Sequence, residues 1–479
     1  MNLHGIKQIS AALHSKDISV QELHDIYTNR HAIHAEQLNC FINTTPELAK
    51  KQIKSSQALI DSNQANILTG IPIVHKDLFC TKDIKTTCAS HMLENFVAPY
   101  DATIVENLNQ AGMVTLAKAN MDEFAMGSSN ENSYFGAVKN PWDHNRVPGG
   151  SSGGSAALVA AGLSPIATGS DTGGSIRQPA ALCGVTGIKP TYGRASRYGM
   201  VAFASSLDQA GVFARSAEDC TLILSQMCGF DPKDSTSAQV DNENFAINQN
   251  QSIKGLKVGV ISEWMDLLPE NIKLTTQQAI NKLKDLGAEL VEIELPTAHL
   301  AVSAYYVIAS AECSSNLSRF DGIRYGQQCS NPKDLNDLYV RSRTEGFGEE
   351  VKRRIMVGTW ALSAGFYDAY YRKAQKIRRL ISEDFKNVDC IASPVSPEIA
   401  FEFNAKKDPV SMYQADVFTI PSSLAGLPCM SMPIGLVDNL PVGLQLIGKN
   451  LSESTILNVA HQYQQDTNFH NLVAEGYHE

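Results

Sequence analysis

Two turns rich in glycine and serine, about two dozen residues apart, carry the residues of this chain that are best suited to chemistry. The first turn, PGGSSGGS, contains Ser151 and Ser152, and the second, SDTGGSIR, contains Ser175. Glycine is used where a backbone turns sharply or approaches a ligand closely. Two such turns so near each other predict one small site that is lined by hydroxyls and backbone N–H groups.

A serine hydroxyl in such a site needs a base that takes its proton as it attacks. The usual base is His, but no His lies in or beside either turn, and the candidate is Lys76 in the apolar run IPIVHKDLF. Burial disfavours the ammonium and lowers a lysine pKa by several units. Neutral Lys76 would then take a proton from Ser151, which takes one from Ser175. Spacing alone favours the alternative, in which a partly exposed Lys76 pairs with Asp77.

The second turn also offers backbone donors. Thr172, Gly173 and Gly174 precede its serine, and a helix is expected to start at Ile176. Such a turn can point several N–H groups at a developing oxyanion, with help from the helix N-terminus. The alternative is a flexible or phosphate-holding glycine loop. No GxxxxGK[ST] motif occurs and the nearest lysine is Lys189, which argues against a phosphate loop.

Strand and helix patterns alternate along the chain and would position these turns. Apolar runs predict strands at 70–79, 113–121, 165–171, 256–261, 288–295, 389–394, 428–436 and 441–448. Helices are expected over 1–60, near 275–286, and around 300–318 and 348–384, with an irregular surface excursion at 229–252. This alternation predicts an α/β fold with a large mixed, mostly buried β-sheet that helices cover. No linker divides the chain, so we expect a single large domain over 1–479.

Two local signals mark helix starts in the N-terminal segment. Ser19 followed by Glu22 suits a capping box, in which each side chain binds the other residue's backbone N–H. Pro46 suits the first turn of a second helix, where its missing N–H costs nothing.

Composition narrows the function classes. The chain has 479 residues, of which 43% are hydrophobic and 19% charged, as in an ordinary soluble globular protein. Its net charge of −10 and its lack of a Lys/Arg-rich run make it a poor direct binder of nucleic acid. The nearest basic candidate, KRR at 352–354, is interpreted as the solvated face of a helix.

The ends and the cysteines predict a cytoplasmic protein. The N-terminus lacks an apolar signal region, and the longest apolar run, about 155–163, is too short to span a bilayer. The ten cysteines are scattered without a CxxC pair, so they predict neither a zinc site nor a disulfide framework. Cys183 and Cys429 lie in apolar segments and are expected to be small buried hydrophobes.

No metal site is predicted. His75, His91 and His144 are isolated in the sequence, and structural roles suit them better than metal ligation. His31 and His34 could share a helix face, but without a carboxylate partner they make a weak site.

Residues 148–196 resemble the amidase signature family, through PGGSSGGSAALVAAG followed by GSDTGGSIRQPAALCGVTGIKPTYGRAS. The resemblance implies the amidase signature fold, with 70–215 as its catalytic core and 1–60 as a helical N-terminal layer. It matches the family's catalytic lysine to Lys76, its bridging serine to Ser151 and its acyl-forming serine to Ser175, and so removes the preference for a structural lysine. It also implies a non-proline cis peptide at Gly150–Ser151.

Three further segments, 305–326, 344–359 and 426–448, are similar to the glutamine-hydrolysing subunits of tRNA-dependent amidotransferases within that family. The similarity implies that Tyr306, Arg354 and Asp416 bind substrate. An Arg fork suits a free carboxylate and an Asp suits an α-ammonium, which together would select free glutamine. Because Arg353 is adjacent, the similarity leaves open which of the two arginines binds the carboxylate.

The similarity also implies the reaction and its partners in a heterotrimer. Ser175 would attack the glutamine amide, backbone N–H groups of residues 172–175 would hold the oxyanion, and the ammonia would pass to a partner, the B subunit. That partner would use ATP and Mg to convert Glu-tRNA(Gln) to Gln-tRNA(Gln), with a small C subunit bridging the two, while this chain holds no cofactor. Two alternatives are a stand-alone amidase for small, aryl or lipid amides and a scaffold protein with a dead site.

Overall fold

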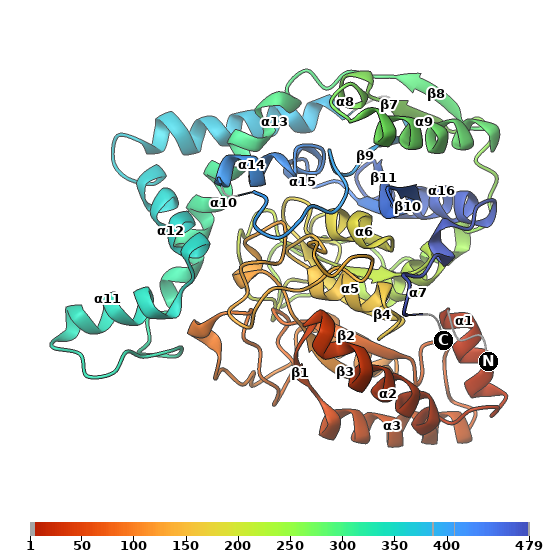
Figure 1. Ribbon diagram of the computed structural model, residues 1–479, viewed down its shortest axis with the longest axis horizontal. Coiled ribbons are helices and arrows are strands. Elements are labelled where there is room, and N and C mark those ends of the chain that lie inside the picture. Colours follow the sequence, from red (N-terminus) through yellow and green to blue (C-terminus); the bar gives the residue numbers. More distant parts are fainter. Residues whose placement is uncertain (1–4, 386–387, 407, 478–479) are drawn as a thin grey trace.

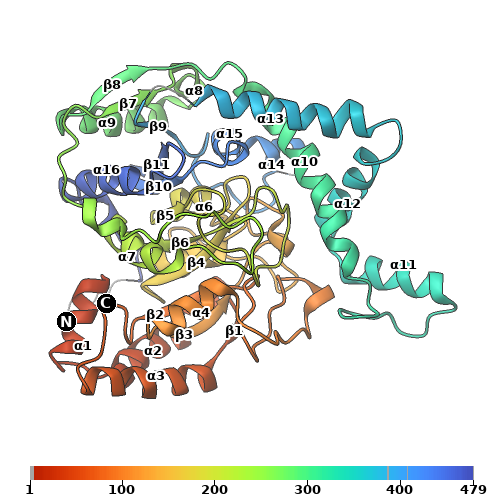
Figure 2. The same ribbon diagram turned by 180° about the vertical axis from the view of Figure 1, so that it is seen from behind.

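A computed structural model describes residues 5–385, 388–406 and 408–477. Within them one mixed sheet of eleven strands runs in the order β1-β3-β2-β4-β6-β5-β10-β11-β9-β7-β8 (Figure 1). Helix α5 lies in front of the sheet in Figure 1 and α4 lies in front in Figure 2, which is seen from behind, so helices cover both faces. The prediction of an α/β fold with a large mixed sheet is confirmed.

The strands are β1 (Phe41–Thr44), β2 (Pro72–Lys76), β3 (Val114–Ala119), β4 (Ile166–Asp171), β5 (Thr186–Lys189), β6 (Gln209–Ala214), β7 (Lys257–Val260), β8 (Glu289–Glu292), β9 (Cys390–Pro394), β10 (Cys429–Val437) and β11 (Leu440–Gly448). The helices are α1 (Ile6–His14), α2 (Val20–Leu38), α3 (Pro46–Asp61), α4 (Thr103–Gln110), α5 (Gly153–Ala160), α6 (Arg177–Cys183), α7 (Ala217–Met227), α8 (Ser262–Met265), α9 (Glu270–Asp285), α10 (Ala301–Asn316), α11 (Leu335–Gly346), α12 (Glu349–Ala361), α13 (Lys373–Asp384), α14 (Pro409–Gln414), α15 (Ile420–Leu424) and α16 (Glu453–Gln465).

The N-terminal layer contains both predicted helix starts. Ser19 Oγ accepts the N–H of Glu22 at 3.2 Å and Glu22 Oε2 accepts the N–H of Ser19 at 2.8 Å, so the capping box at the start of α2 is confirmed. Pro46 opens α3, as predicted. The helical expectation over 1–60, of which residues 1–4 lie outside the described part, missed β1. That strand has only four residues, three half-buried and one exposed, and it exists by pairing with β3, so its own periodicity is too short to reveal it.

The strands nearest the predicted site are buried on both faces. The apolar runs at 70–79, 113–121 and 165–171 form β2, β3 and β4, and every residue of the three strands is buried. Near-continuous apolar runs are typical of such strands. Because β2 runs parallel to both β3 and β4, the carboxyl ends of these strands meet at one edge of the sheet. Lys76 ends β2 and Asp171 ends β4 at that edge.

A helical layer formed by α10 to α13 lies beside the sheet, and α11 projects from the body of the molecule (Figures 1 and 2). The prediction of one long helical stretch over 348–384 is wrong in its middle. Helix α12 ends at Ala361, the chain passes Gly365 at φ +88°, and a π-helical turn, η6 (Tyr367–Arg372), leads into α13. Only glycine adopts that backbone conformation readily, which explains the break. Helix α11 was not predicted.

The segment 229–252 is irregular apart from one short 3₁₀ helix, η3 (Phe245–Asn248), as predicted. It is nevertheless anchored to the body. The Asp231 carboxylate accepts hydrogen bonds from the hydroxyls of Thr103 and Ser196, each at 2.6 Å, and the Phe245 side chain is buried. The prediction of a surface excursion therefore holds for the backbone path and fails for these side chains.

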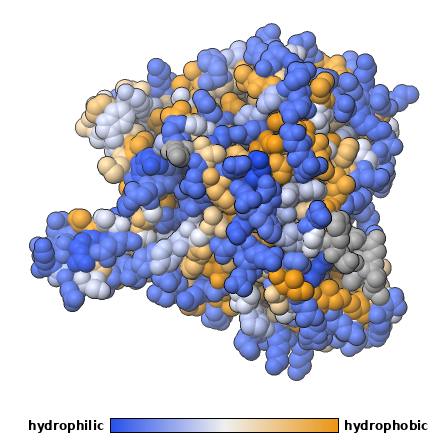
Figure 3. Space-filling model, viewed as in Figure 1, coloured by the Kyte–Doolittle hydropathy of each residue, from blue (hydrophilic) through white to orange (hydrophobic). Residues whose placement is uncertain are grey.

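All ten cysteines are buried as free thiols, which confirms the expectation for Cys183 and Cys429. No helix in the described ranges is both long and apolar enough to cross a membrane. Hydrophilic side chains cover most of the face shown in Figure 3, including most of the projecting arm around α11.

Candidate active site

Lys76 forms the centre of the candidate site, and its side chain is 0% exposed. Its Nζ contacts three hydroxyls, with Ser151 Oγ at 2.8 Å, Ser152 Oγ at 2.8 Å and Ser170 Oγ at 2.9 Å. Ser151 and Ser152 come from the first Gly/Ser turn, before α5, and Ser170 from the end of β4. The structure thus brings Lys76 and Ser151 together, and it adds two hydroxyl contacts that the sequence did not reveal.

The alternative in which an exposed Lys76 pairs with Asp77 is wrong. Successive residues of an extended chain point to opposite sides. Asp77 Oδ1 instead lies 3.2 Å from Lys118 Nζ, and Lys118 also donates to Phe79 O at 2.8 Å. Asp77 is therefore paired elsewhere, and Lys76 remains available for chemistry.

Burial adjusts the charge of Lys76. Its removal from water lowers the pKa of the amine to about 7, although the carboxylates of Asp122, Asp171 and Asp208 and the thiol of Cys88 act to raise it. Desolvation disfavours the ammonium because an ion in a low-dielectric interior loses its hydration. A large share of Lys76 is therefore neutral near pH 7 and able to accept a proton.

The hydroxyl hydrogens indicate how a neutral amine is held. Ser152 Oγ donates to Ser170 O at 3.2 Å, so its hydrogen points away from Lys76 and it accepts from the amine. A neutral amine has two hydrogens and one lone pair, so one of the three hydroxyls must donate to it. Ser151 and Ser170 are the two that can. Ser151 belongs to the same turn as Ser152, whose N–H donates to the Ser175 carbonyl at 3.3 Å.

Ser175 lies at the opening of this network. It is 8% exposed, whereas Ser151 is fully buried, and its carbonyl accepts the N–H of Ser152 at 3.3 Å. The Gly150–Ser151 peptide is cis, as the resemblance implied. No hydrogen bond joins the hydroxyls of Ser151 and Ser175 in the described structure. Catalytic hydrogen bonds often tighten only when substrate is bound, so this spacing is compatible with a relay.

The turn before Ser175 presents unused backbone donors. The N–H groups of residues 172–175 donate no hydrogen bond to any part of the chain that the structure describes. The Thr172 hydroxyl is turned away and donates to Asp208 Oδ1 at 2.7 Å, while Thr419 Oγ1 donates to Gly173 O at 2.6 Å. These contacts fix the turn by its side chain and carbonyl, so its N–H groups stay free to hold an oxyanion.

Two glycines of this turn are required by their surroundings. A Cβ on Gly173 would lie 2.8 Å from the ring of Tyr305, and a Cβ on Gly174 would lie 2.3 Å from Thr419 Oγ1. Gly174 also has a φ of +153°, which side-chain-bearing residues rarely adopt. The GG pair of the motif thus reflects close packing, which explains its presence independently of any ligand.

A buried ion pair supports the same turn. The Asp171 carboxylate accepts from Arg177 Nε at 2.9 Å and Nη2 at 2.8 Å, and it also accepts the N–H of Ile176 at 3.2 Å. Arg177 donates further to Thr419 O at 2.9 Å. Helix α6 starts at Arg177, one residue from the predicted Ile176. Sequence reasoning did not identify this pair, although a charged residue inside the buried motif SDTGGSIR was the available signal.

The predicted substrate-binding residues cluster beside the turn. The Arg354 guanidinium on α12 lies over three aromatic rings, at 4.9 Å from the centroid of Tyr306, 5.4 Å from Tyr413 and 5.5 Å from Phe203. The rings of Tyr306 and Tyr413 are themselves stacked at 3.7 Å. Arg354 Nε donates to Glu350 Oε1 at 2.7 Å. The ring contacts hold the guanidinium in place, and its Nη1 and Nη2 groups donate no hydrogen bond within the described residues.

The adjacent arginines differ sharply in burial. The Arg354 side chain is 5% exposed and that of Arg353 is 45% exposed, where Arg353 pairs with Glu350. Successive helix residues point about 100° apart, so one faces the site and the other faces solvent. The interpretation of 352–354 as a solvated helix face is therefore correct for Lys352 and Arg353 and wrong for Arg354.

Asp416 joins the substrate-binding group to the oxyanion turn. Its Oδ1 lies 3.4 Å from the position that a Cβ on Gly174 would take, and its Oδ2 accepts a hydrogen bond from Ser128 Oγ at 2.5 Å. Burial raises the pKa of Asp416 to about 7. A cation placed beside this carboxylate would stabilise its ionised form and would be bound in return.

One site results from the two groups of residues. Tyr305 lies against Gly173, and its ring meets the ring of Tyr306 edge-on at 5.0 Å. Asp416 lies against Gly174. The sequence did not identify Tyr305, Ser128 or Thr419, because their contacts with the turn join residues far apart in the chain.

The remaining candidates lie outside this arrangement. His75 is wholly buried, its Nδ1 lies 3.4 Å from Thr168 Oγ1, and burial lowers its pKa to about 3. His31 contacts Leu163 O at 2.7 Å. Lys189 donates to Pro190 O at 3.0 Å. Among residues with a described placement, no group of three or more His, Cys, Asp or Glu side chains could hold a metal ion.

The sequence model of the amidase family, described as "Amidase", matches residues 22–457. The chain is 56% identical over 483 residues to the A subunit of glutamyl-tRNA(Gln) amidotransferase from Nitrosococcus oceani, and the match covers 100% of both chains. It is 57% identical over 476 residues to the protein of that name in Coxiella burnetii, covering 98% of this chain and 99% of that one.

Solved structures of amidotransferase and amidase proteins also match the fold of this chain. The A subunit of glutamyl-tRNA(Gln) amidotransferase from Thermotoga maritima matches with a TM-score of 0.77 and 37% identity, over 94% of this chain and 95% of that one. The peptide amidase of Stenotrophomonas maltophilia matches with a TM-score of 0.83 and 26% identity, over 100% of this chain and 99% of that one.

Proposed function

The chain belongs to the amidase family, and we propose that it is the glutamine-hydrolysing A subunit of a tRNA-dependent amidotransferase. The observation that carries the proposal is the juxtaposition of the Lys76 amine and its serine hydroxyls with a buried Arg354 and Asp416 at the same turn. The full-length identity to curated relatives of that name supports it.

Glutamine is oriented through its α-carboxylate and α-ammonium groups. The Arg354 fork binds the α-carboxylate, and Asp416, once ionised, pairs with the α-ammonium. Tyr306 forms a wall beside the guanidinium, at 4.9 Å. With its α-carbon held there, the side-chain amide reaches the turn at Gly174 and the hydroxyl of Ser175. A plain amide lacks both charges and would be bound poorly.

Acylation follows from the hydroxyl network. Neutral Lys76 takes the proton of Ser151 as Ser151 takes the proton of Ser175, and Ser175 Oγ forms a bond to the amide carbon. The carbonyl oxygen becomes an oxyanion that the free N–H groups of Thr172, Gly173 and Gly174 stabilise. The C–N bond then breaks, the relay returns the proton to nitrogen, and ammonia leaves a γ-glutamyl ester on Ser175.

Deacylation uses the same groups in reverse. A water molecule gives a proton to the relay as it attacks the ester, the same N–H groups hold the second oxyanion, and Ser175 recovers its proton as glutamate leaves. No step needs a cofactor in this chain.

The ammonia is used by a partner within a heterotrimer. The B subunit uses ATP and Mg to activate Glu-tRNA(Gln) and receives the ammonia, and a small C subunit bridges the two, so tRNA is bound mainly through the B subunit. The net charge of −10 on this chain agrees with that division. The complex works in the cytoplasm, where aminoacyl-tRNA is used.

We further propose that 1–479 acts as a single amidase domain, with 1–60 as a helical layer and 70–215 as the catalytic core.

The test is co-expression of this chain with candidate B and C subunits, followed by an assay of Glu-tRNA(Gln) conversion. We expect conversion that depends on glutamine and ATP and that free ammonia can replace glutamine. Hydrolysis of peptide, aryl or lipid amides by the isolated chain, with no conversion by the complex, would instead support a stand-alone amidase. A complex that uses ammonia alone would indicate a scaffold protein with a dead site.

A further inference from the structure

A fully buried carboxylate, that of Asp122, lies beneath the Gly150–Ser151 peptide. Asp122 follows β3, the strand next to β2, and Lys76 pairs in the sheet with Ala119, three residues earlier. The N–H of Asp122 donates to Ser151 O at 3.1 Å. Its Oδ2 lies 2.1 Å from the position that a Cβ on Gly150 would take. Asp122 therefore contacts both residues of the peptide whose serine binds Lys76.

The surrounding chain makes room for this carboxylate and holds it still. A Cβ on Gly127 would lie 2.3 Å from Asp122 Cγ, so only glycine fits there as well. The carboxylate oxygens accept the N–H groups of Asn130 at 2.9 Å and Asn132 at 3.1 Å. A buried carboxylate without a counter-ion is costly, so its retention calls for a nearby positive charge.

Lys76 is the cation that meets this requirement. Of the three carboxylates around Lys76, Asp171 is paired with Arg177 at 2.8 Å, and Arg197 acts on Asp208. Asp122 forms no ion pair within the described ranges, and the charge of Lys76 lowers its pKa while that of Glu131 raises it. Burial raises the pKa of Asp122 to about 7, and among the charges near Lys76 that of Asp122 raises the lysine pKa most.

We propose that Asp122 is a positioning residue that serves as the counter-charge of Lys76, stabilising the ammonium that forms when Lys76 takes the relay proton. The proposal rests on the proposed function, since it needs the relay. Because burial lowers the pKa of Lys76 and raises that of Asp122, the two groups titrate in the same pH range, and the charge on one affects the titration of the other. During attack the proton that leaves Ser151 resides on Lys76 and its charge is balanced by the Asp122 carboxylate.

The test is Asp122→Asn in the assembled complex, with glutaminase kcat/KM measured against pH. Loss of the negative charge lowers the pKa of Lys76, so the acidic limb should move to lower pH by about 1 unit. A weaker base should also lower kcat on the plateau by roughly threefold to tenfold, with KM unchanged. A variant that was only structurally damaged would scale the whole profile without moving the limb, and that result would overturn the proposal.

Asp219→Asn is the matched control. Asp219 is also a buried carboxylate that accepts a backbone N–H, from Ile6 at 2.9 Å, but it lies on α7 and contacts no residue of the site. The limb should stay in place in this variant. If Lys76→Met kept glutaminase activity, the proposed relay would be wrong. If Lys76→Met were inactive but the acidic limb of the pH profile did not move in Asp122→Asn, only the counter-charge role of Asp122 would be wrong.

NMR of the wild-type protein gives a second test, which needs no variant at Asp122. The ¹⁵N resonance of the Lys76 Nζ, identified by its loss in Lys76→Met, should titrate in two steps between about pH 5 and 9, one for the amine and one for the carboxylate beside it. A single step would overturn the proposal.

Discussion

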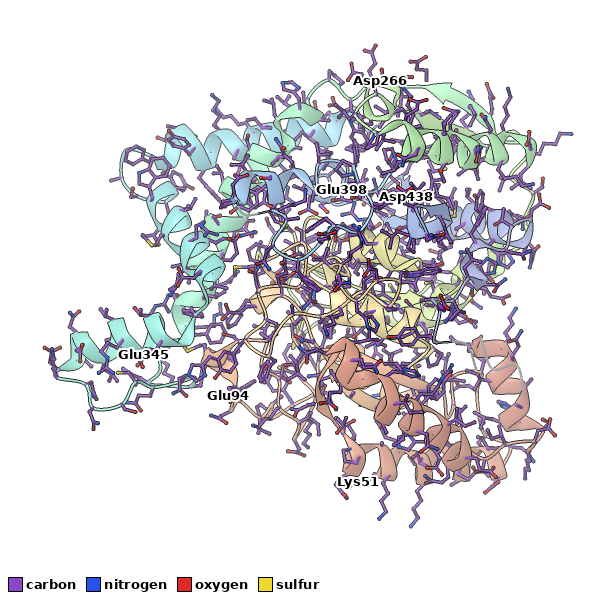
Figure 4. The ribbon with its side chains drawn as sticks, in the orientation of Figure 1. Lys51, Glu94, Asp266, Glu345, Glu398 and Asp438 are labelled. Atoms are coloured by element: carbon purple, nitrogen blue, oxygen red, sulfur yellow. The ribbon has the colours of Figure 1, made fainter. Side chains whose placement is uncertain are left out.

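The candidate active site is built from two regions that hold their polar side chains in different ways. Around Lys76, the hydroxyls come from β4 and the turn before α5, and every residue of those elements is buried. Around Arg354, the side chain is held by ring stacking on a helical layer whose outer residues are exposed, with Met356 at 72%. Helix α11, on which Figure 4 labels Glu345, projects from this layer.

This difference suits the first region to catalysis and the second to substrate binding. A close-packed interior does not adjust, so groups that must meet a transition state are best placed there. A layer of stacked rings with solvent on its outer side can adapt to a ligand that enters and leaves. Variants in the first region should therefore lower kcat, and variants in the second should raise KM.

Ser175→Ala should have the largest effect. Without its nucleophile the complex should lose glutaminase activity by at least about 10⁴-fold. Amidation of Glu-tRNA(Gln) with free ammonia should persist, because the variant leaves the partner's site intact. Both activities are measured on the same preparation. Loss of both would contradict the assignment of Ser175 as nucleophile.

Lys76→Arg removes the base and keeps a cation. Because a guanidinium does not lose its proton, glutaminase kcat should fall by about 10²–10⁴-fold. Steady-state kinetics at saturating glutamine checks this. Near-normal turnover would show that Lys76 is structural after all.

Gly174→Ala tests the oxyanion turn. The new Cβ would lie 2.3 Å from Thr419 Oγ1 and would displace the N–H groups, so kcat should fall by about 10²-fold. Gly365→Ala is the control, since Gly365 also has a positive φ but nothing lies within 4 Å of its Cβ position. If both variants lost turnover equally, backbone strain alone would explain the effect.

The pH profile should be set by the buried amine. Burial lowers the pKa of Lys76 to about 7, so the base is protonated and inactive below that pH and neutral above it. Glutaminase kcat/KM should rise about tenfold per pH unit below 7 and level off above it. A limb near the ordinary lysine pKa would contradict this.

Arg354→Ala should have the smallest effect on turnover and sharpen the contrast between the regions. Losing a charged hydrogen bond to the α-carboxylate should raise KM for glutamine by about 10- to 100-fold, with kcat changed far less. Arg353→Ala should leave KM unaltered, because that side chain points to solvent. The reverse result would transfer the carboxylate-binding role to Arg353.

Much of the first region could be predicted from local sequence, and less of the second. The strands β2, β3 and β4 show as continuous apolar runs, and the Ser19–Glu22 capping box is a four-residue signal. Helix α11 escaped prediction because its apolar residues are exposed and form no buried stripe.

Contacts between residues far apart in the chain could not be predicted from local sequence patterns. The hydrogen bond from Ser128 to Asp416 joins residues 288 apart, and that from Thr419 to Gly173 joins residues 246 apart. The choice between Arg353 and Arg354 depends on which side of α12 faces the body, which adjacent identical residues do not reveal.

Alkylation of the ten buried thiols would show where the folded protein opens locally. Burial raises the pKa of most of them, to about 12 for Cys40 and Cys390, so almost no thiolate is present at neutral pH. Because the thiolate is the species that reacts with alkylating agents, the native protein should label slowly. With a slow reagent, each cysteine would then be modified in proportion to how often its own segment is open, so mass spectrometry of the labelled peptides would map local stability across the sheet.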